Sequence, residues 1–462
     1  MKTNNAPCPE GAFSFDTIAA ISTGSVLSAI GIVRVSGPDS LAILDQVFRP
    51  AFGAPMSRRP DRQLVYGALM DSEGRTLDLC LATISRGPNS YTGEDTAELQ
   101  CHGSPTVLRE ALRILFAAGA RQAKAGEFTR RAFVNGRMDL IQTEAVIDLI
   151  DSETPQAART AAQQLNGAVS RRTDTVYQEL SGICSHFHAV LDYPDEDIED
   201  FELQSYRQTL REAMAQLQAL SDSYRRGSVV KNGLLTAIIG RANVGKSSLM
   251  NALLGYERAI VTDIAGTTRD TIEEKAVVGD LLLRLTDTAG QRETADPVEQ
   301  LGVQRARETA ASAGLVLAVL DGSVPLTEED RAILREAEDA EHSLVILNKS
   351  DLPAAFSYPE GIRVSAATGA GLRELEDKIQ ALFPEDKKFT DGEILTSARQ
   401  SEAANRALEY LRAAESAMEA GIPPDAVLTE IEGAMNALAE LSGRSVREDI
   451  TNGIFARFCV GK

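Results

Sequence analysis

The sequence predicts a multidomain protein with three structural parts: an α+β N-terminal domain, an all-α helical domain, and an α/β domain inserted into the helical one. Alternating apolar residues near the N-terminus indicate strands. Apolar residues at three- and four-residue steps on both sides of the middle of the chain indicate helices. Apolar runs separated by helical stretches lie between them, as in doubly wound α/β domains. The predicted boundaries are 1–130, 131–228 together with 386–462, and 229–385.

The N-terminal part mixes strand and helix signals. GIVRVS (31–36) predicts a strand, and a helix is expected to begin near Pro38-Asp39. Residues 64–84 alternate around a DSEG turn, which is typical of a hairpin. AELQCHG (97–103) predicts another strand, and residues 105–118 a helix. This order predicts an α+β domain.

Helical periodicity begins at Gly136 and continues to about residue 228. The acidic stretch DYPDEDIEDFE (192–202) interrupts it, and we interpret this stretch as a solvated loop or a helix start. A polar linker, PEDKKFTDGE (384–393), precedes a second helical stretch, 396–458, which is broken at Pro423-Pro424. The sequence alone leaves open whether the two helical stretches pack together.

The central part has five apolar runs separated mostly by helical stretches. They are LLTAIIG (234–240), LLLRLTDTAG (281–290), LVLAVLDGS (315–323), LVILNKSD (344–351) and RVSAATG (363–369). Strands that alternate with helices in this way predict a doubly wound α/β domain ending near residue 385.

Composition limits the partners that the chain can have. Of its 462 residues, 43% are hydrophobic and 25% charged, which is ordinary for globular proteins. The formal net charge of -20 excludes nucleic-acid binding by bulk electrostatics, so an RNA partner requires a local basic patch or a second protein. The best basic cluster is interpreted first as a solvated face; its members are Arg121, Lys124, Arg130, Arg131 and Arg137. Without a long apolar span, signal or transit peptide, we expect a cytoplasmic chain that binds no membrane.

The cysteines are scattered along the chain. They stand at positions 8, 80, 101, 184 and 459, are odd in number and never form a CxxC pair. This pattern predicts reduced thiols, with neither disulfides nor a structural zinc site.

GRANVGKSS (240–248) is a phosphate-binding motif in the required context, because it follows an apolar strand and opens a helix. Gly240 and Gly245 let backbone N–H groups wrap the phosphates. Lys246 can reach the β- and γ-phosphates, and the Ser247 hydroxyl can ligate Mg²⁺. The N-terminus of the helix adds its positive end.

Four further motifs follow in order and together predict a GTPase domain of the translation-factor-like class. In GTTRD (266–270) Thr268 can complete the Mg²⁺ shell, and in DTAG (287–290) Asp287 can support it while the Gly290 N–H meets the γ-phosphate. The Asp of NKSD (348–351) can accept two N–H groups from guanine, and SAA (365–367) can contact the base O6. The predicted GTP-contacting residues are Asn243, Val244, Gly245, Lys246, Ser247, Ser248, Thr262, Asp263, Ile264, Ala265, Gly266, Thr267, Thr268, Asp287, Thr288, Ala289, Gly290, Asn348, Lys349, Ser350, Asp351, Ser365, Ala366 and Ala367.

Cleavage of the γ-phosphate needs a group that positions water and a group that neutralises developing charge. Gln291 directly follows DTAG, and Glu299 lies eight residues later; both are candidates for the first role. The side-chain oxygen of Asn243, inside the phosphate-binding loop, can hold a monovalent cation beside the phosphates. K⁺ there would act as an arginine finger does.

The chain resembles the MnmE (TrmE) family of tRNA uridine-modification GTPases nearly end to end. The resemblance rests on GPNSYTGEDTAELQCHG (87–103), GEFTRRAFVNGRMDLIQTEAVIDLI (126–150), LDYPDE (191–196), GRANVGKSSLMNALLG (240–255), IVTDIAGTTRD (260–270) and the terminal FCVGK (458–462). It implies a GTPase that, with the FAD-dependent partner MnmG (GidA), adds a carboxymethylaminomethyl or aminomethyl group to C5 of the wobble uridine, U34, of tRNA.

The resemblance also implies cofactors and an assembly. The one-carbon unit comes from a tetrahydrofolate derivative, 5-formyl- or methylene-tetrahydrofolate, held by the N-terminal domain, which also forms the homodimer. GTP hydrolysis with Mg²⁺ is activated when K⁺ pairs the two GTPase domains. MnmG joins in a heterotetramer or larger complex, and FAD enters only through that partner.

Roles for individual residues follow from the same resemblance. Implied K⁺ ligands are Asn243, Thr262, Ile264 and Thr267, and implied Mg²⁺ ligands are Ser247 and Thr268. Implied folate contacts are Arg34, Glu98, Arg137 and Lys462. Glu299 matches the catalytic glutamate, and Gln291, where the family usually has an apolar residue, is interpreted as turned away. The C-terminal tail is expected to fold back toward the folate pocket, with Cys459 a candidate for chemistry or a buried wall.

Two other classes compete with this interpretation. A ribosome-assembly GTPase of the Era or EngA type is the first, but EngA-like chains carry two GTPase domains, and Era-like chains end in a KH fold with a GxxG loop, which 396–462 lacks. The second is an interaction scaffold whose N-terminal domain binds no small molecule. Folate binding distinguishes the scaffold from the enzyme.

Overall fold

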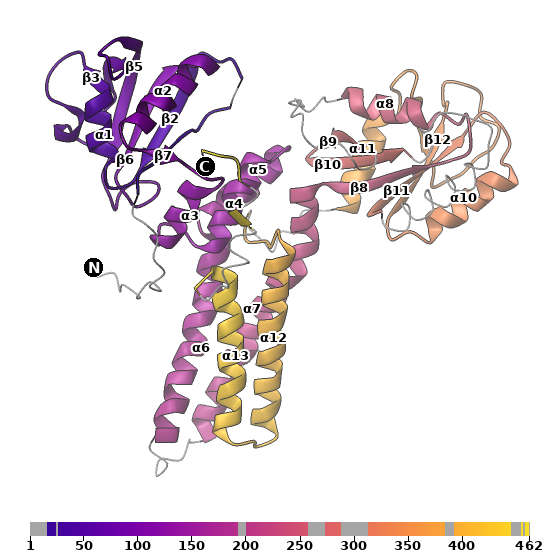
Figure 1. Ribbon diagram of the computed structural model, residues 1–462. Coiled ribbons are helices and arrows are strands. Elements are labelled where there is room, and N and C mark those ends of the chain that lie inside the picture. Colours follow the sequence, from indigo (N-terminus) through magenta and orange to yellow (C-terminus); the bar gives the residue numbers. More distant parts are fainter. Residues whose placement is uncertain are drawn as a thin grey trace, which may run out of the picture. The chain divides into compact units, whose positions relative to one another are not determined.

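The computed structural model describes residues 16–24, 26–192, 200–256, 273–287, 313–383, 392–444, 454–455 and 458–461. Contacts within the chain divide it into two units: Met1–Ile147 with Leu438–Lys462, and Asp148–Ala437. The first unit therefore joins the N-terminal part to the end of the chain. Figure 1 shows the elements of both units.

The first unit is built on a seven-stranded sheet with the order β3-β4-β5-β6-β2-β1-β7. Its strands are β1 (Ile18–Ile21), β2 (Ile30–Ser36), β3 (Phe48–Pro50), β4 (Val65–Met70), β5 (Thr76–Ser85), β6 (Thr96–His102) and β7 (Arg121–Gln122). Neighbours pair antiparallel except β1 and β7, which are parallel. The predicted hairpin over 64–84 and the strands over 31–36 and 97–103 are confirmed.

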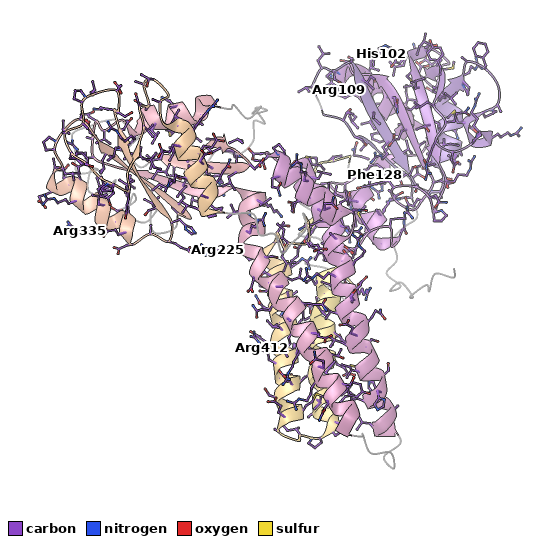
Figure 2. The ribbon with its side chains drawn as sticks, turned by 180° about the vertical axis from the view of Figure 1, so that it is seen from behind. His102, Arg109, Phe128, Arg225, Arg335 and Arg412 are labelled. Atoms are coloured by element: carbon purple, nitrogen blue, oxygen red, sulfur yellow. The ribbon has the colours of Figure 1, made fainter. Side chains whose placement is uncertain are left out.

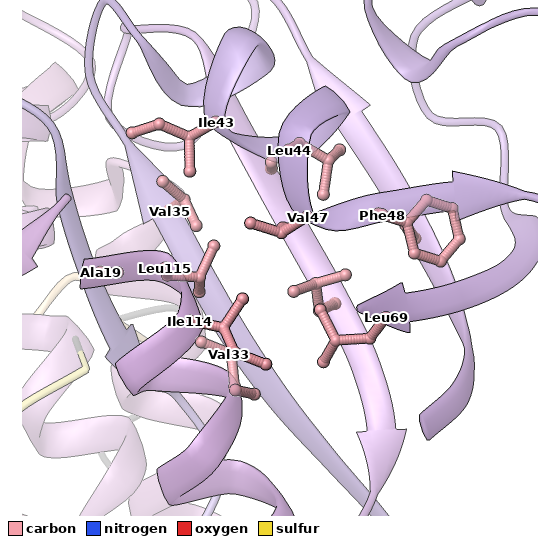
Figure 3. Close-up of a cluster of buried hydrophobic side chains, with 14 of the residues drawn as sticks. Ala19, Val33, Val35, Ile43, Leu44, Val47, Phe48, Leu69, Ile114 and Leu115 are labelled. Carbon is pink, nitrogen blue, oxygen red and sulfur yellow. The ribbon is translucent and has the colours of Figure 1, made fainter. Parts of the chain in front are cut away.

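One face of this sheet carries the core of the unit (Figure 3). Val33 and Val35 of β2 pack with Ile43 of α1 (Ser40–Val47) and Leu115 of α2 (Pro105–Ala117). A short 3₁₀ turn, Met56–Arg58, adds Met56 to the same cluster. Successive strand residues point to opposite faces. Arg34, between the two valines, therefore belongs to the other face of the sheet.

Among the described residues, the first unit also contains α3 (Glu127–Val134), most of α4 (Leu140–Ile150) and the end of α13 (Pro424–Ser442). The prediction that helix continues to residue 458 is wrong, because α13 ends at Ser442. Gly443 adopts a left-handed φ of 84°, and a Cβ there would lie 2.8 Å from both Leu140 and Phe133. A glycine at this position ends the helix and allows close packing.

A network of ion pairs holds α3 against the N-terminal strands. Arg131 donates to Asp16 (2.8 Å), Glu94 (3.1 Å) and Glu127 (3.0 Å), and Arg121 also pairs with Asp16 and Glu127. The Arg131 side chain is only 12% exposed, so the interpretation of this cluster as a solvated face is wrong for Arg131. Burial raises the pKa of Glu127, but hydrogen bonds from Arg121, the Lys124 backbone and Arg131 outweigh it and lower the pKa to about 2.

The second unit contains a six-stranded sheet with the order β13-β12-β11-β8-β10-β9. Its strands are β8 (Leu234–Ile239), β9 (Glu273–Val278), β10 (Leu281–Asp287), β11 (Leu315–Asp321), β12 (Ser343–Asn348) and β13 (Ile362–Arg363). All pairs are parallel except β9 with β10. The helices around it are α8 (Lys246–Tyr256), α10 (Glu328–Glu338) and α11 (Leu372–Leu382). The predicted doubly wound pattern is confirmed.

The last predicted strand, 363–369, is largely a loop. β13 ends at Arg363, and Ser365 instead exchanges backbone hydrogen bonds with Gly369 and Ala370. Gly369 and Gly371 both have left-handed φ values, which favour a tight turn over a strand.

The other helices that the structure describes are α5 (Pro155–Leu165), α6 (Ala168–Asp192), α7 (Asp200–Asn232) and α12 (Ala398–Glu419). α6, α7, α12 and α13 run side by side (Figure 1). α7 meets α12 through hydrogen bonds that include Ser221 to Asn405 (2.6 Å) and Arg412 to Gln218 (2.8 Å). The two helical stretches therefore pack together, which the sequence left open. Among the helices described, none is long and apolar enough to cross a bilayer.

Replacing Glu127 with glutamine should destabilise the first unit by about 1.5–3 kcal/mol at neutral pH, because Arg121 and Arg131 lose a charged hydrogen-bond partner. The folded-state pKa of about 2 lies below the ordinary value of 4.5. The stabilisation is therefore complete above the ordinary value and is lost as the pH falls toward the folded one. The difference in unfolding free energy between wild type and Glu127→Gln should narrow as the pH falls from about 5 to about 2. Hydrogen exchange in peptides of this unit measures it.

The control is Glu110→Gln on α2, where Glu110 and its partner Arg113 have side chains 43% and 77% exposed. It should change stability by less than about 0.5 kcal/mol, as exposed pairs do. A Glu127→Gln effect no larger than this control, or one independent of pH, would contradict the assignment.

Candidate functional site

The phosphate-binding loop connects β8 to α8 at the carboxyl edge of the second unit's sheet. A Cβ on Gly240 would lie 2.5 Å from the Val319 carbonyl oxygen, and one on Gly245 would lie 2.2 Å from Asn348 Nδ2. Both positions therefore require glycine. Asn243 adopts a left-handed φ of 63°, which asparagine tolerates better than most residues. The loop has the backbone that the motif predicts.

Lys246 and Ser247 begin α8 and lie at the entrance to this loop. The Lys246 ammonium donates to the carbonyl oxygens of Gly240 (2.7 Å) and Arg241 (2.9 Å). The Ser247 hydroxyl belongs to an exposed residue at the positive end of the helix. An ammonium, a hydroxyl and a helix N-terminus are the donor set that binds a Mg²⁺-nucleotide, so these residues fit that ligand.

Asn348, the first residue of NKSD, ties two loops together. Its Nδ2 donates to the Val244 carbonyl (2.8 Å), and its Oδ1 accepts from the Ala366 N–H (3.1 Å). The side chain is buried, with the residue 2% exposed. Because the amide uses both ends, it sets the distance between the phosphate-binding loop and the SAA loop. Asn348 thus has a structural role beside the predicted contact with the base.

Asp351 is held ready at the base-recognition end. Ser365 donates its hydroxyl to Asp351 Oδ1 (2.6 Å), and the Ser350 N–H donates to the Val364 carbonyl (3.1 Å). Asp351 itself is exposed. One carboxylate oxygen is thereby oriented, and the group remains accessible to N–H donors such as those of guanine.

Asp321, which the sequence reasoning did not select, supports the same region. It ends β11 and accepts from Lys349 Nζ (2.7 Å) and from the Ser323 hydroxyl (2.5 Å). Burial raises the pKa of Asp321, but the hydrogen bonds from Lys349 and Ser323 outweigh it and hold the pKa below its usual value. A polar residue at the end of a buried strand was the signal that could have identified it.

Many predicted site residues lie outside the part of the chain that the structure describes. They are Thr262, Asp263, Ile264, Ala265, Gly266, Thr267, Thr268, Thr288, Ala289, Gly290, Gln291, Glu299 and Lys462. Only the backbone of Asp287, at the end of β10, is described.

A second candidate site lies on the first unit, on the sheet face opposite the core. Arg34 Nε donates to Glu98 Oε1 at 2.8 Å, and both residues line a cavity of about 380 Å³. The Arg34 guanidinium lies 5.3 Å from the centre of the Tyr91 ring and 5.8 Å from that of Phe128. The size falls within the range of small-molecule sites, and the lining offers a cation, a carboxylate and an aromatic surface.

Other residues of this cavity were not selected from the sequence. Tyr91 lines it and shares a hydrogen bond of 2.9 Å with the Thr129 hydroxyl, while burial raises the Tyr91 pKa. Arg62 and Gln100 also line it. Arg137 does not; the stem of its side chain lies against Gly93, where a Cβ would be 3.2 Å from Arg137 Cγ. Of the three predicted folate contacts that are described, the structure brings two together.

The described tail residues 458–461 contact the first unit. Val460 forms an antiparallel bridge with Ala125, and the Ser22 hydroxyl donates to the Gly461 carbonyl at 2.9 Å. Ser22 directly follows β1, whose Ala20 pairs with Arg34. Gly461 thus lies next to the end of β1, and β1 pairs with β2, the strand that carries Arg34. Cys459 is exposed, so the alternative of a buried wall is wrong.

A glycine allows this close approach. Gly126 has a left-handed φ of 66°, and a Cβ there would lie 2.8 Å from the Phe455 carbonyl oxygen and 3.1 Å from Phe458 Cβ. The Phe455 ring packs against Phe133, with ring centres 6.4 Å apart. The glycine that begins GEFTRRAF is therefore needed for the tail to dock.

Family models match most of the chain. The MnmE helical domain matches residues 140–459, and the N-terminus of the GTP-binding protein TrmE matches residues 17–137. The second match covers the strands that carry Arg34 and Glu98, and the first covers the phosphate-binding loop and most of the tail.

Relatives that match over nearly their full length are also MnmE proteins. The tRNA modification GTPase MnmE of Thermoanaerobacter pseudethanolicus is 41% identical over 459 residues, which cover 97% of this chain and 100% of the relative. That of Clostridioides difficile is 39% identical over 460 residues, with the same coverage. A crystal structure of Era from Aquifex aeolicus is 25% identical over 38% of this chain and 66% of its own, with a TM-score of 0.26, too low to bear on function. The chain belongs to the tRNA modification GTPase MnmE family.

Proposed function

We propose that this chain hydrolyses GTP to drive modification of tRNA at C5 of the wobble uridine, together with an FAD-dependent partner of the MnmG class. The observation that supports it most is the Asn348 amide, which joins the phosphate-binding loop to the base-recognition loop in a chain that also carries the Arg34–Glu98 cavity. The alternative of an Era- or EngA-type ribosome-assembly GTPase gains no support, because the full-length relatives are MnmE proteins.

In this proposal the phosphate-binding and base-recognition residues bind and orient GTP. Lys246 exchanges its two carbonyl partners for the β- and γ-phosphates, a short movement for a flexible side chain. Ser247 and Thr268 hold Mg²⁺, which neutralises charge on the phosphates. Asp351, oriented by Ser365, accepts two N–H groups of guanine. Adenine lacks that pair of donors, so the carboxylate selects GTP.

Cleavage in this proposal depends on a cation and a carboxylate. Asn243 contributes its side-chain oxygen to K⁺, with Thr262, Ile264 and Thr267 completing the site, and K⁺ offsets charge that develops as the phosphate leaves. Glu299 orients the attacking water, and Gln291 is turned away. The exposed position of Asn243 on a left-handed turn places its side chain at the loop surface, where a second GTPase domain can approach.

The Arg34–Glu98 cavity is the proposed site of a tetrahydrofolate derivative. A pterin ring presents N–H donors to a carboxylate such as Glu98, and the anionic glutamate end of a folate is complementary to arginine. Arg137 and Lys462 are proposed to extend the site. The contact of Gly461 with Ser22, directly after β1, supports a position of Lys462 near this cavity.

A homodimer through the open face of the N-terminal sheet is part of the proposal. Ile30, Tyr66 and Leu79 lie on the same face as Arg34 and are 60%, 53% and 52% exposed. Large apolar side chains gathered on one side of a sheet favour an interface. The partner MnmG would join this dimer as a heterotetramer or larger complex and bring the FAD.

The rate of GTP hydrolysis in KCl and in NaCl at equal ionic strength tests the nucleotide half of the proposal. K⁺ should stimulate hydrolysis more than about tenfold, since a cation in the arginine-finger position can contribute about 10³–10⁵. Asn243→Ala should remove the stimulation. Asn251→Ala, an exposed asparagine on α8, is the matched control and should keep it. Equal rates in the two salts would refute the K⁺ site and favour Gln291 as the catalytic group.

Single-turnover hydrolysis separates the two water-positioning candidates. Glu299→Ala should lower the single-turnover rate constant of hydrolysis by about 10²–10⁴, the usual contribution of a catalytic acid–base group, and should leave the affinity for GTP unchanged. Gln291→Ala should hydrolyse GTP at nearly the wild-type rate. The reverse pattern would show that Gln291 positions the water.

Calorimetric titration of the full chain with 5-formyl-tetrahydrofolate tests the cavity. Arg34→Ala and Glu98→Gln should each weaken binding about 10- to 100-fold, because each removes a charged hydrogen-bonding group. Arg113→Ala, an exposed arginine on α2, should bind like wild type. Absence of binding by the wild-type chain, with GTP hydrolysis intact, would favour the scaffold interpretation of this domain.

A further inference from the structure

Strand pairing brings two cysteines together that are distant in sequence. β5 and β6 pair antiparallel with Leu81 opposite Gln100, which places Cys80 opposite Cys101 one step along. The two residues are 4% and 1% exposed and belong to the core face of the N-terminal sheet. Asp78 lies two residues before Cys80 on the same strand, so it shares that face. Three potential metal-binding side chains thus occupy one end of a strand pair.

Their donor atoms lie close together. The two Sγ atoms and a carboxylate oxygen of Asp78 are all within 4.8 Å of one another. In a tetrahedral zinc site, with Zn–S about 2.3 Å and Zn–O about 2.0–2.2 Å, donor atoms are on the order of 3.5–4 Å apart. Side-chain rotations that move the donor atoms by about one ångström or less therefore bring Asp78, Cys80 and Cys101 to bonding distance of one ion.

The cluster also lacks a positive partner. The Asp78 side chain is only 8% exposed, and among the described residues no lysine or arginine pairs with it. Its partner is His102, whose Nδ1 lies 2.7 Å from Oδ1 and whose backbone N–H donates to Oδ2 (2.8 Å). A buried carboxylate beside two thiols is costly without a cation.

We propose that Asp78, Cys80 and Cys101 form a binding site for a thiophilic divalent cation of the zinc class, with His102 holding the Asp78 carboxylate in place. Thiolate sulfur and carboxylate oxygen are accepted ligands of zinc. Carboxylates that ligate a metal are in turn held by hydrogen bonds from outer residues, as His102 holds Asp78. His102 lies at the rim of the N-terminal sheet (Figure 2) and is exposed, which gives the ion a route to Asp78.

Binding involves no oxidation or reduction. The cation forms bonds to two sulfurs and one carboxylate oxygen and keeps one water as its fourth ligand. Both thiols lose their protons to solvent, so affinity rises with pH. The site lies on the core face of the sheet, whereas Arg34 and Glu98 lie on the opposite face. Metal binding here is therefore independent of the proposed nucleotide and folate sites and acts through stability of the N-terminal unit.

Titration of the reduced, metal-free full chain with Co²⁺ tests the site. Cobalt bound by two thiolates in a tetrahedral site gives strong visible bands and a near-ultraviolet sulfur-to-metal band, and one equivalent should produce them. Zn²⁺ should displace the cobalt and raise the unfolding temperature of the N-terminal unit. Cys80→Ser, Cys101→Ser and Asp78→Asn should each weaken metal binding by more than about 100-fold, beyond the 10–100-fold cost of losing an outer partner. His102→Ala should cost about 10–100-fold.

Two variants keep the result interpretable. Cys184→Ser removes a buried thiol of the second unit, which lies 3.5 Å from the sulfur of Met435 in that same unit, and it should leave cobalt binding unchanged. His102→Ala changes an exposed side chain, so its loss of affinity cannot come from misfolding of the core. Unaltered cobalt bands in Cys80→Ser and Cys101→Ser, or no stabilisation of the wild type by Zn²⁺, would overturn the proposal. So would loss of metal binding in Cys184→Ser alone.

Discussion

The alternation of side chains across the N-terminal sheet is the constraint on which the first unit depends. Helices cover one face, so every second strand residue must be apolar and buried. The strand residues between these apolar ones point to the opposite face, where Arg34 lies beside Glu98 and both line an open cavity. The same rule sends Cys80 and Cys101 to the covered face. A shift of register by one residue would exchange the two sets and remove both sites.

In the second unit, the corresponding constraint is the meeting of parallel strands at their carboxyl ends. Loops that follow β8, β11, β12 and β13 lie there, and the buried amide of Asn348 sets the distance between the phosphate-binding loop and the SAA loop. Lys349 and Asp321 join two of these strand ends by an ion pair across neighbouring strands. The loops are therefore positioned before nucleotide binds, which lowers the entropy cost of binding.

The C-terminal tail contacts residues near the N-terminus, and no local sequence pattern predicts these contacts. Its docking depends on two close approaches, at Gly126 and at Gly461, where a Cβ would lie 2.1 Å from the Ile21 carbonyl oxygen. The ion-pair network around Arg131 holds α3, and with it Gly126, against the N-terminal strands. The sequence suggested a surface patch of five basic residues, but two of them, Arg121 and Arg131, form ion pairs that stabilise the fold. Net charge alone could not separate these roles, because pairing depends on distant carboxylates such as Asp16.

The sequence by itself determined the elements whose causes are local. Period-two and helical spacing predicted the strands and helices, and glycine positions predicted the phosphate-binding loop, because backbone freedom is a property of the residue itself. Only the tertiary structure decided the helix end at Gly443, the burial of Arg131, the support of Lys349 by Asp321 and the pairing of Cys80 with Cys101. Each of these joins residues distant in the chain, and such contacts follow from strand register and packing, which no short stretch of sequence encodes.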